Sequence, residues 1–434
     1  MKIECGPGVV CSGEFLATTV ERAAMPGTVP YMDRVALRRA APWSAAVVLV
    51  AVLGGALVME AHREITDPGD SDSIALVTGG RLVIADPQHL YSPVAQERAE
   101  AILLHIPPAD HFLAPFTNIA AGALILSPLA HADLWTASEI AVLTSTLFFA
   151  TALLLAFRFL APVSSRPLRS AIAVAAVLSI PAVEAIVQWD SLMTVALLGS
   201  VLLAERRRYG WAGLLLATLV LKPQVLWLVV PALVAARSWR YLAGLLLGWG
   251  LWVAVSLIIT GPQGFVALMH LVAGNYPEQS NRSIGLPSLV SAATGSGEVG
   301  FIAAGCLGGI AAALLLWRGD VVRGQPVAAV AIGLVLSLLC SPHVTLEDLM
   351  LTVLPIALIA RRWPFLALAE AVAISVVEVI QLQLPTGVQH MQPFLLAVIA
   401  VSTLRAVRPV LTSTSAGRVG DPRLRNRGAG AVST

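Results

Sequence analysis

The sequence predicts an all-α protein, a polytopic bundle of transmembrane helices, and two observations lead to this class. Of the 434 residues, 57% are hydrophobic and only 12% are charged, whereas a soluble globular domain carries roughly 25% charged residues. Apolar stretches also recur along the whole chain with the length of about 20 residues that a helix needs to cross a bilayer. The net charge of +2 comes from basic residues scattered between these stretches, so nucleic acid is not an expected partner.

The N-terminal region, residues 1–41, is expected to be a disordered cytoplasmic arm that precedes the first span. Its first part, Met1 to Tyr31, is either such an arm or lies before the natural start, because a normal membrane-protein N-terminus begins at Met32. No small-residue cleavage pattern follows the apolar residues Ser44 to Met59. The first span is therefore predicted to be a retained helix rather than a signal peptide.

A single transmembrane domain over residues 42–408 is predicted to contain about 11–13 membrane segments. Lys and Arg concentrate in short cytoplasmic loops, and the arginine-containing loops place the N-terminus in the cytoplasm and a large first loop, 62–113, outside. The tail 409–434, rich in Ser, Gly and Arg, is expected to be disordered. The candidate spans are 42–61, 134–157, 169–187, 190–204, 211–221, 224–236, 240–260, 299–317, 325–340, 345–360, 364–383 and 391–407, with a shorter apolar segment at 114–130.

Two segments do not fit simple crossings. Segment 114–130 has to enter and leave on the same face, and segment 211–236 is basic at both ends with Lys222-Pro223 in its middle. About eleven helical residues at a rise of 1.5 Å cover roughly half of the hydrocarbon core. Segment 211–236 is thus either a re-entrant pair broken at Lys222, which is tolerated where backbone lines a polar cavity, or a single kinked span.

The outer loop 62–113 contains the first candidate residues for chemistry. It begins with "DPGDSDS", which holds Asp67, Asp70 and Asp72, and includes an amphipathic stretch, "PVAQERAEAILLHI", suited to the membrane interface. Loop aspartates can simply be solvated. A carboxylate close to a membrane-embedded cavity is nevertheless a candidate functional group, and it could serve as general base towards a hydroxyl.

Lys222 is the only lysine outside the N-terminal arm. Either its side chain extends to the interface, or it binds an anion such as a phosphate inside the bilayer. His343 lies in "SPHVTLED", where Glu347 and Asp348 can cap the next helix through its dipole; His343 could instead touch a phosphate or a sugar hydroxyl. Arg282, in a polar outer loop, is a candidate contact for a lipid head group.

A polar pair, Gln188 and Asp190, separates two spans on the outer side. With it, the order of the motifs resembles glycosyltransferase family 87, the polyprenyl-phosphate-mannose-dependent mannosyltransferases of the GT-C class, over residues 42–408. The resemblance rests on an acidic residue after the first helix (Asp70 or Asp72), then "DPQHLY", Gln188 with Asp190, "LKP", "NYPEQSNRS" and "SPHVTLEDLM". The chain departs from the family at Leu76, where a tyrosine is usual, at Asp190, where asparagine is usual, and at "LAPFTN".

The resemblance implies a GT-C-type bundle in the plasma membrane with its active site on the extracytoplasmic side. It implies transfer of a sugar, in the first place mannose, from a polyprenyl-phosphate donor to a glycolipid or polysaccharide acceptor, with inversion. Asp72, ahead of Asp70, would be the base, and no metal or other cofactor is expected. The phosphate and head-group contacts would come from Lys222, His343 and Arg282, with Gln188, Asp190 and Asp348 as further substrate-binding residues.

Other interpretations stay open at this point. A secondary transporter or lipid flippase is also polytopic with charges inside the membrane, and the same class of enzyme could move arabinose or glucose. A protein that had lost its base would have no catalytic role. The scarcity of lysine together with abundant Ala, Gly and Val suggests an actinobacterial source.

Overall fold

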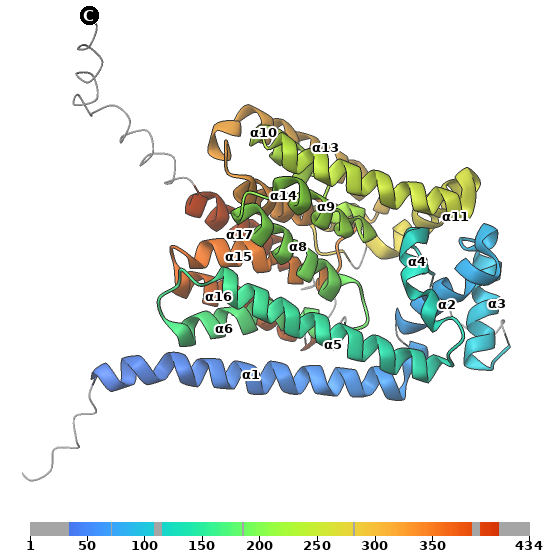
Figure 1. The fold of residues 1–434 in the computed structure, drawn as a ribbon, viewed down its shortest axis with the longest axis horizontal. Coiled ribbons are helices and arrows are strands. Elements are labelled where there is room, and N and C mark those ends of the chain that lie inside the picture. Colours follow the sequence, from blue (N-terminus) through green and yellow to red (C-terminus); the bar gives the residue numbers. More distant parts are fainter. Residues whose placement is uncertain are drawn as a thin grey trace, which may run out of the picture. The chain divides into compact units, whose positions relative to one another are not determined.

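The computed structural model describes residues 34–70, 72–107, 115–184, 186–280, 283–383 and 391–407, and every regular element in these ranges is helical (Figure 1). The all-α class is thereby confirmed. The chain divides into the units Met1–Ala41 and Pro42–Thr434, and the second carries everything discussed below. Its α-helices, after α1 (Arg34–Thr66), are α2 (Asp72–Ala85), α3 (Pro93–Leu104), α4 (Ala120–Leu126), α5 (Leu134–Phe159), α6 (Arg166–Val177), α7 (Ile180–Glu184), α8 (Asp190–Glu205), α9 (Tyr209–Leu216), α10 (Val229–Ala235), α11 (Trp239–Ser280), α12 (Leu286–Thr294), α13 (Gly297–Trp317), α14 (Pro326–Cys340), α15 (Val353–Ala360), α16 (Pro364–Gln383) and α17 (Gln392–Val407).

Short 3-10 helices join several of these elements. They are η1 (Pro68–Asp70), η2 (Pro87–His89), η4 (Ser127–Leu129), η5 (Ala217–Leu221), η6 (Pro223–Val225), η7 (Gly319–Val321) and η8 (Leu346–Thr352). They account for several places where a predicted span is interrupted. The predicted span 345–360, for example, begins as η8 and continues as α15, and the predicted span 169–187 is divided between α6 and α7 at Leu178 and Ser179.

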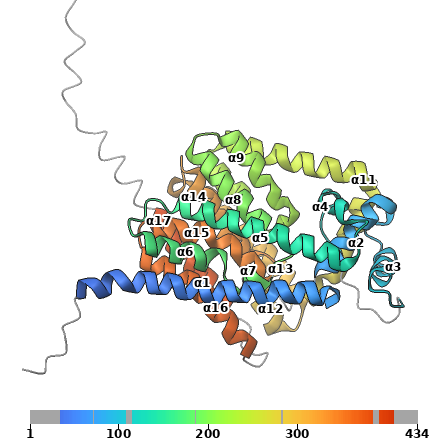
Figure 2. The ribbon, with the colours of Figure 1, turned by 60° about the horizontal axis from the view of Figure 1, so that its bottom comes forward.

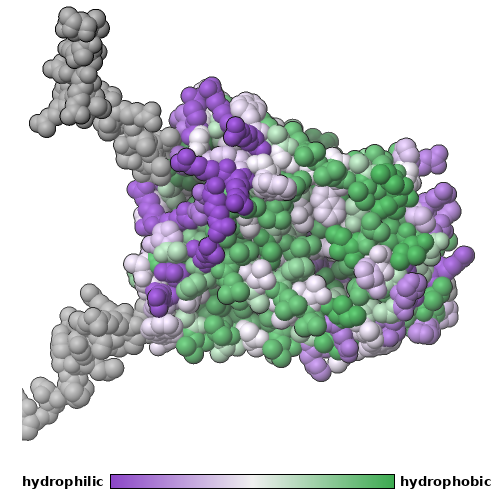
Figure 3. All heavy atoms as spheres, viewed as in Figure 1, coloured by the Kyte–Doolittle hydropathy of each residue, from purple (hydrophilic) through white to green (hydrophobic). Residues whose placement is uncertain are grey.

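A membrane bundle is supported by the length and composition of the helices. Within the described ranges, four stretches are long and apolar enough to cross a membrane, namely Trp43–Thr66, Leu134–Phe159, Trp239–Val272 and Gly297–Trp317. They coincide with four of the predicted spans. On the face shown in Figure 3, apolar side chains fill a broad band and polar side chains gather at its two ends, as expected for a bundle with one end on each side of a bilayer.

One end of the bundle collects arginines. The chain passes through Arg206–Arg208 after α8, through Arg237 after α10, and through Arg361 and Arg362 after α15. Arg361 donates to Glu205 at 2.7 Å, which joins the turns after α8 and α15. The Gly324 amide, in the turn before α14, donates to the Ala236 carbonyl at 3.0 Å, and Gln325 in that turn lines one cavity with Arg207 and Arg361, so all these turns lie together. We call this the arginine-rich end. Helices α8 and α15 run to it from the opposite end, where α2 also begins.

The segment around Lys222 is a re-entrant pair. Helix α9 starts directly after Arg206–Arg208, continues as η5, and stops at Lys222, whose backbone (φ −128°, ψ 80°) is not helical. After η6, helix α10 returns to the arginine-rich end, because Ala236 contacts Gly324 there. Of the two alternatives left by the sequence, the structure therefore has the broken pair rather than a single kinked span.

Backbone contact holds α9 against the first part of α11, and the two helices lie side by side in Figures 1 and 2. A Cβ atom built on Gly213 would lie 2.0 Å from the Tyr241 carbonyl oxygen, and one on Gly244 would lie 2.1 Å from the Gly210 carbonyl oxygen. Glycine is therefore required at both positions by the close approach of the two main chains, a packing mode typical of membrane helices.

The predicted outer loop is largely helical. Helix α2 is buried over most of its length, from Ser73 to Gly80, so Asp72 is its first residue rather than a loop residue. The amphipathic stretch forms α3, and its buried Gln96 holds the chain on both sides of this helix. The Gln96 side chain donates to the Leu90 carbonyl at 2.7 Å and accepts from the Phe116 amide at 2.9 Å. The short apolar segment 114–130 forms α4 and η4, which pack beside α2.

The contact between α9 and α11 predicts the effect of one substitution. Gly213→Ala should lower the thermal unfolding midpoint of the detergent-purified protein, because its Cβ would meet main-chain atoms that cannot rotate away; such overpacking costs roughly 1–3 kcal/mol. Gly210→Ala, in the same helix, is the control, since nothing lies within 4 Å of its new Cβ. Equal midpoints for the two variants would contradict the close contact.

Candidate functional site

Lys222 lies at the centre of a cluster of carboxylates. Its Nζ is 2.8 Å from Asp190 Oδ2, 3.1 Å from Asp348 Oδ1 and 3.5 Å from Glu347 Oε1. The Asp348 side chain is fully buried, Asp190 is 1% exposed and Lys222 is 12% exposed. Charges with so little access to water have to be paired to be tolerated, and each of these residues supplies a partner for another.

Gln188 connects this cluster to Asp72. The Gln188 side-chain carbonyl accepts from Lys222 Nζ at 3.1 Å, and its amide nitrogen donates to Asp72 Oδ2. One amide group thus links the ammonium to a second, more accessible carboxylate. An amide that donates on one side and accepts on the other fixes the distance between its two partners.

Local structure places each carboxylate. Asp190 is the first residue of α8 and Asp348 lies in the first turn of η8, where the exposed amides of a helix start favour negative charge. The two oxygens of Asp348 have separate partners: Oδ1 faces Lys222, while Oδ2 accepts from the Thr345 amide at 3.0 Å and the Thr345 hydroxyl at 3.2 Å. The capping interpretation of this stretch is therefore confirmed for Asp348, which also belongs to the cluster.

The break in the helix at Lys222 allows its side chain to reach the carboxylate cluster. A continuous helix through Lys222 would need the amide of residue 223 as a donor, and Pro223 has none. The chain instead passes from η5 through one extended residue to η6. Lys222 therefore sits in the turn of a re-entrant pair, at the end of the bundle away from the arginines, and meets the starts of α8 and η8 there.

Carboxyl groups outnumber the cation in the cluster. Asp72, Asp190, Glu347 and Asp348 supply four carboxyl groups around the single ammonium of Lys222. All three of its N–H bonds are directed to oxygens of Gln188, Asp190 and Asp348. Within the described ranges no group of three or more His, Cys, Asp or Glu side chains has the arrangement of a metal site.

Asp72 is the member of the site best placed to meet a substrate. Its surface is open to solvent, yet surrounding protein desolvates the carboxylate and raises its pKa, as does the negative charge of Glu347. Lys222 and the hydrogen bond from Gln188 act in the opposite direction and favour the ionised form.

His343 stands beside the same cluster. Its Nδ1 is buried and has no hydrogen-bond partner among the described residues. Burial lowers the pKa of the imidazole, and the charge of Asp348 opposes this effect. A neutral imidazole with a free ring nitrogen can donate or accept one hydrogen bond, and a phosphate or hydroxyl group could use this buried nitrogen once neighbouring atoms move aside.

Five residues singled out in the sequence come together here: Asp72, Gln188, Asp190, Lys222 and Asp348. His343 adjoins them, while the Asp70 side chain and Arg282 fall outside the described residues. Glu347 belongs to the site but was considered only as a helix-capping residue. The signal that could have identified it is its position next to Asp348 in a stretch with two consecutive acids between apolar segments.

Comparison with known proteins gives one match. The model of glycosyltransferase family 87 matches residues 116–342, which is just over half of the chain and includes Gln188, Asp190 and Lys222. No curated protein and no solved structure matches the chain.

The central ion pair predicts a large stability effect. Lys222→Met should destabilise the folded protein by about 3–5 kcal/mol, because it leaves buried carboxylates without their counter-charge. Thermal unfolding in detergent measures the effect. The double variant Lys222→Met with Asp190→Asn should recover part of the loss, since it removes the most closely paired carboxylate. A double variant no more stable than the single one would show that the lysine does not stabilise the site through its charge.

Proposed function

The chain belongs to glycosyltransferase family 87, and is thus a membrane glycosyltransferase; we propose that it transfers a sugar, in the first place mannose, from a polyprenyl-phosphate donor to a glycolipid or polysaccharide acceptor. In this proposal the bundle is of the GT-C class and lies in the plasma membrane. Basic residues concentrate on the cytoplasmic side of membrane proteins. The arginine-rich end would therefore face the cytoplasm and the carboxylate cluster the extracytoplasmic side.

One observation carries the proposal: an accessible carboxylate, Asp72, is joined through the single amide of Gln188 to a buried cation, Lys222. Transfer of a sugar with inversion requires a base that removes the proton from the acceptor hydroxyl while that oxygen attacks the anomeric carbon. The bond from this carbon to the phosphate oxygen breaks at the same time, and the phosphate leaves with the electron pair. Asp72 is the base in this scheme.

The remaining residues would orient these groups. Gln188 holds Asp72 in place, and Asp190 and Asp348 hold Lys222. Contact between Lys222 and a donor phosphate requires that one of its three hydrogen bonds be exchanged, because all its protons are directed to protein oxygens. The unpartnered nitrogen of His343 needs no such exchange, but it is buried and neighbouring atoms would have to move before a phosphate could reach it. We therefore assign phosphate contact to Lys222 and His343, with Arg282 as a further candidate.

Transfer from a defined donor tests the proposal. Membranes containing the protein would receive polyprenyl-phosphate-[radiolabelled mannose] and host acceptors, with and without a chelator, since we expect no requirement for a metal. Asp72→Asn should reduce transfer by about 10²–10⁴-fold, the usual contribution of a general base. Glu298→Gln removes an exposed carboxylate from the first turn of α13 and should leave transfer unchanged.

Two outcomes would contradict the proposal. Full activity of a correctly inserted Asp72→Asn protein would remove Asp72 as the base. If no polyprenyl-phosphate sugar serves as donor for the inserted wild-type protein, while a labelled lipid or solute crosses proteoliposomes that contain it, the alternative of a transporter or flippase would take its place.

The pKa of Asp72 predicts a pH profile. A base acts when deprotonated, so transfer should fall as the pH decreases through the raised pKa of Asp72. The hydrogen bond from Gln188 lowers this pKa, so Gln188→Leu should move the acid limb of the kcat/KM profile to higher pH. His343→Gln is the comparison, because a limb that belongs to Asp72 stays when the histidine is removed. A limb unaffected by Gln188→Leu would show that Asp72 does not control it.

A further inference from the structure

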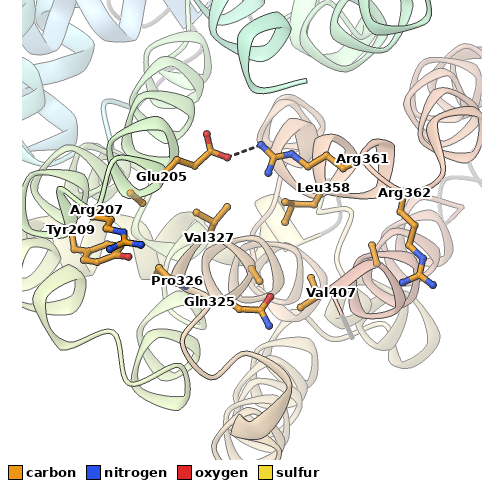
Figure 4. A pocket seen from close by; sticks show the side chains of 13 residues that line it. Glu205, Arg207, Tyr209, Gln325, Pro326, Val327, Leu358, Arg361, Arg362 and Val407 are labelled. Carbon is orange, nitrogen blue, oxygen red and sulfur yellow. Dashed lines mark hydrogen bonds and ion pairs between the residues drawn. The ribbon is translucent and has the colours of Figure 1, made fainter. Parts of the chain in front are cut away.

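We propose that the arginine-rich end contains a second binding site, which takes the phosphate group of an anionic lipid or of a soluble phosphate ester. A cavity of about 640 Å³ opens there, within the range of roughly 300–1,000 Å³ that is usual for ligand pockets. Figure 4 shows its polar lining, which consists of Glu205, Arg207, Tyr209, Gln325, Arg361 and Arg362.

This cavity is separate from the carboxylate cluster. Helix α8 begins at Asp190, in the cluster, and ends at Glu205, in the cavity wall. Sixteen helical residues extend about 24 Å at a rise of 1.5 Å per residue. The two sites therefore lie at opposite ends of the same helix, and a phosphate group bound in one cannot touch the residues of the other.

Arg361 is held in a fixed position with donors to spare. Its Nη2 donates to Glu205 Oε1 at 2.7 Å and to the Phe159 carbonyl at 3.0 Å, and its guanidinium carbon lies 3.9 Å from the centre of the Phe159 ring. Both of these hydrogen bonds use one nitrogen. Nε and Nη1 make no hydrogen bond to any described residue, so Arg361 can still donate single charge-assisted hydrogen bonds to a phosphate.

Arg207 reaches the cavity from the other side and beside Tyr209 (Figure 4). Its backbone has φ +60°, the left-handed conformation that costs an L-residue roughly 1–2 kcal/mol and that helix ends usually give to glycine. An arginine at this position directs a charged side chain back to the end of α8. Together with Arg362 the cavity has three arginines against one glutamate, so its net charge is positive.

The residues that line the cavity indicate the chemical class of its ligand. Planar guanidinium groups recognise phosphate in two-point contacts, and basic pockets between membrane helices on the cytoplasmic side bind anionic lipid head groups. Apolar residues, among them Val327, Leu358 and Val407, complete the lining. They suit the glycerol or acyl part of a lipid, while Tyr209 and Gln325 offer hydrogen bonds to hydroxyl groups.

The test measures binding to the full-length wild-type protein by native mass spectrometry. The probes are phosphatidylinositol, phosphatidylcholine as the neutral lipid, and inositol 1-phosphate as the soluble ester. The double variant Arg207→Gln with Arg362→Gln should weaken binding by about tenfold or more, since each lost charge-assisted hydrogen bond is worth about 1.5–3 kcal/mol. This variant leaves the contacts of Arg361 intact. The control is Arg206→Gln with Arg240→Gln, two exposed arginines outside the cavity wall.

Each outcome decides the matter. Selective binding of phosphatidylinositol that only the cavity variant loses would establish the site and name a lipid as its ligand. The same pattern with inositol 1-phosphate as well would establish the site for phosphate esters in general. Equal loss in the control variant would show attraction to surface charge alone, and no binding of either phosphate would leave no ligand for the cavity; both results would overturn the proposal.

Discussion

The site depends on one ammonium group that holds three segments of chain together. Lys222 lies between η5 and η6, Asp190 begins α8, and Asp348 lies in η8, so residues more than a hundred positions apart converge on a single nitrogen. In such a cluster the unfavourable and favourable electrostatic free energies nearly cancel. Removing charges from water is expensive, and the mutual attraction of the charges offsets this cost only while every partner is in place. The geometry around Lys222 is consequently one that tolerates little displacement.

Irregular backbone is the means by which this convergence is reached inside an apolar bundle. An uninterrupted helix would have carried Lys222 along its side, towards lipid or a neighbouring helix. The break at Pro223 instead turns the chain back and leaves the lysine at the turn. The freed backbone groups are satisfied locally: the Lys222 amide donates to the Leu219 carbonyl, and the Lys222 carbonyl accepts from the Val225 amide. Polar backbone at this depth is tolerated because protein, rather than lipid, surrounds it.

How far the sequence predicts this arrangement differs from residue to residue. Lys222 could be found because a lone lysine in an apolar stretch is expensive and therefore conspicuous, and the motif order pointed to Gln188, Asp190 and Asp348. The hydrogen bond from Gln188 to Asp72 could not be found, since it joins the turn before α8 to the start of α2, 116 positions apart, and hydrophobic periodicity does not record such a contact. Helix α2 was missed because the polar residues before it suggested a loop, although it is buried once packed. The division between α6 and α7 could have been found, because Pro181 has no amide to donate to the Val177 carbonyl and α6 ends at Val177.

The glycine contact between α9 and α11 bears on how the protein is made. Helix α9, η5 and α10 leave the ribosome after α8 but before α11, α13 and α14, and they pack against these helices. Until the later helices are made, the re-entrant pair consists of two half-length segments that are not stable in lipid by themselves, and Lys222 can pair with Asp190 but not yet with Asp348. We therefore expect the re-entrant pair to take its final position only after α11 has been made, when Gly244 can pack against Gly210. The surroundings of Lys222 are therefore complete only after α11 and η8 have been made.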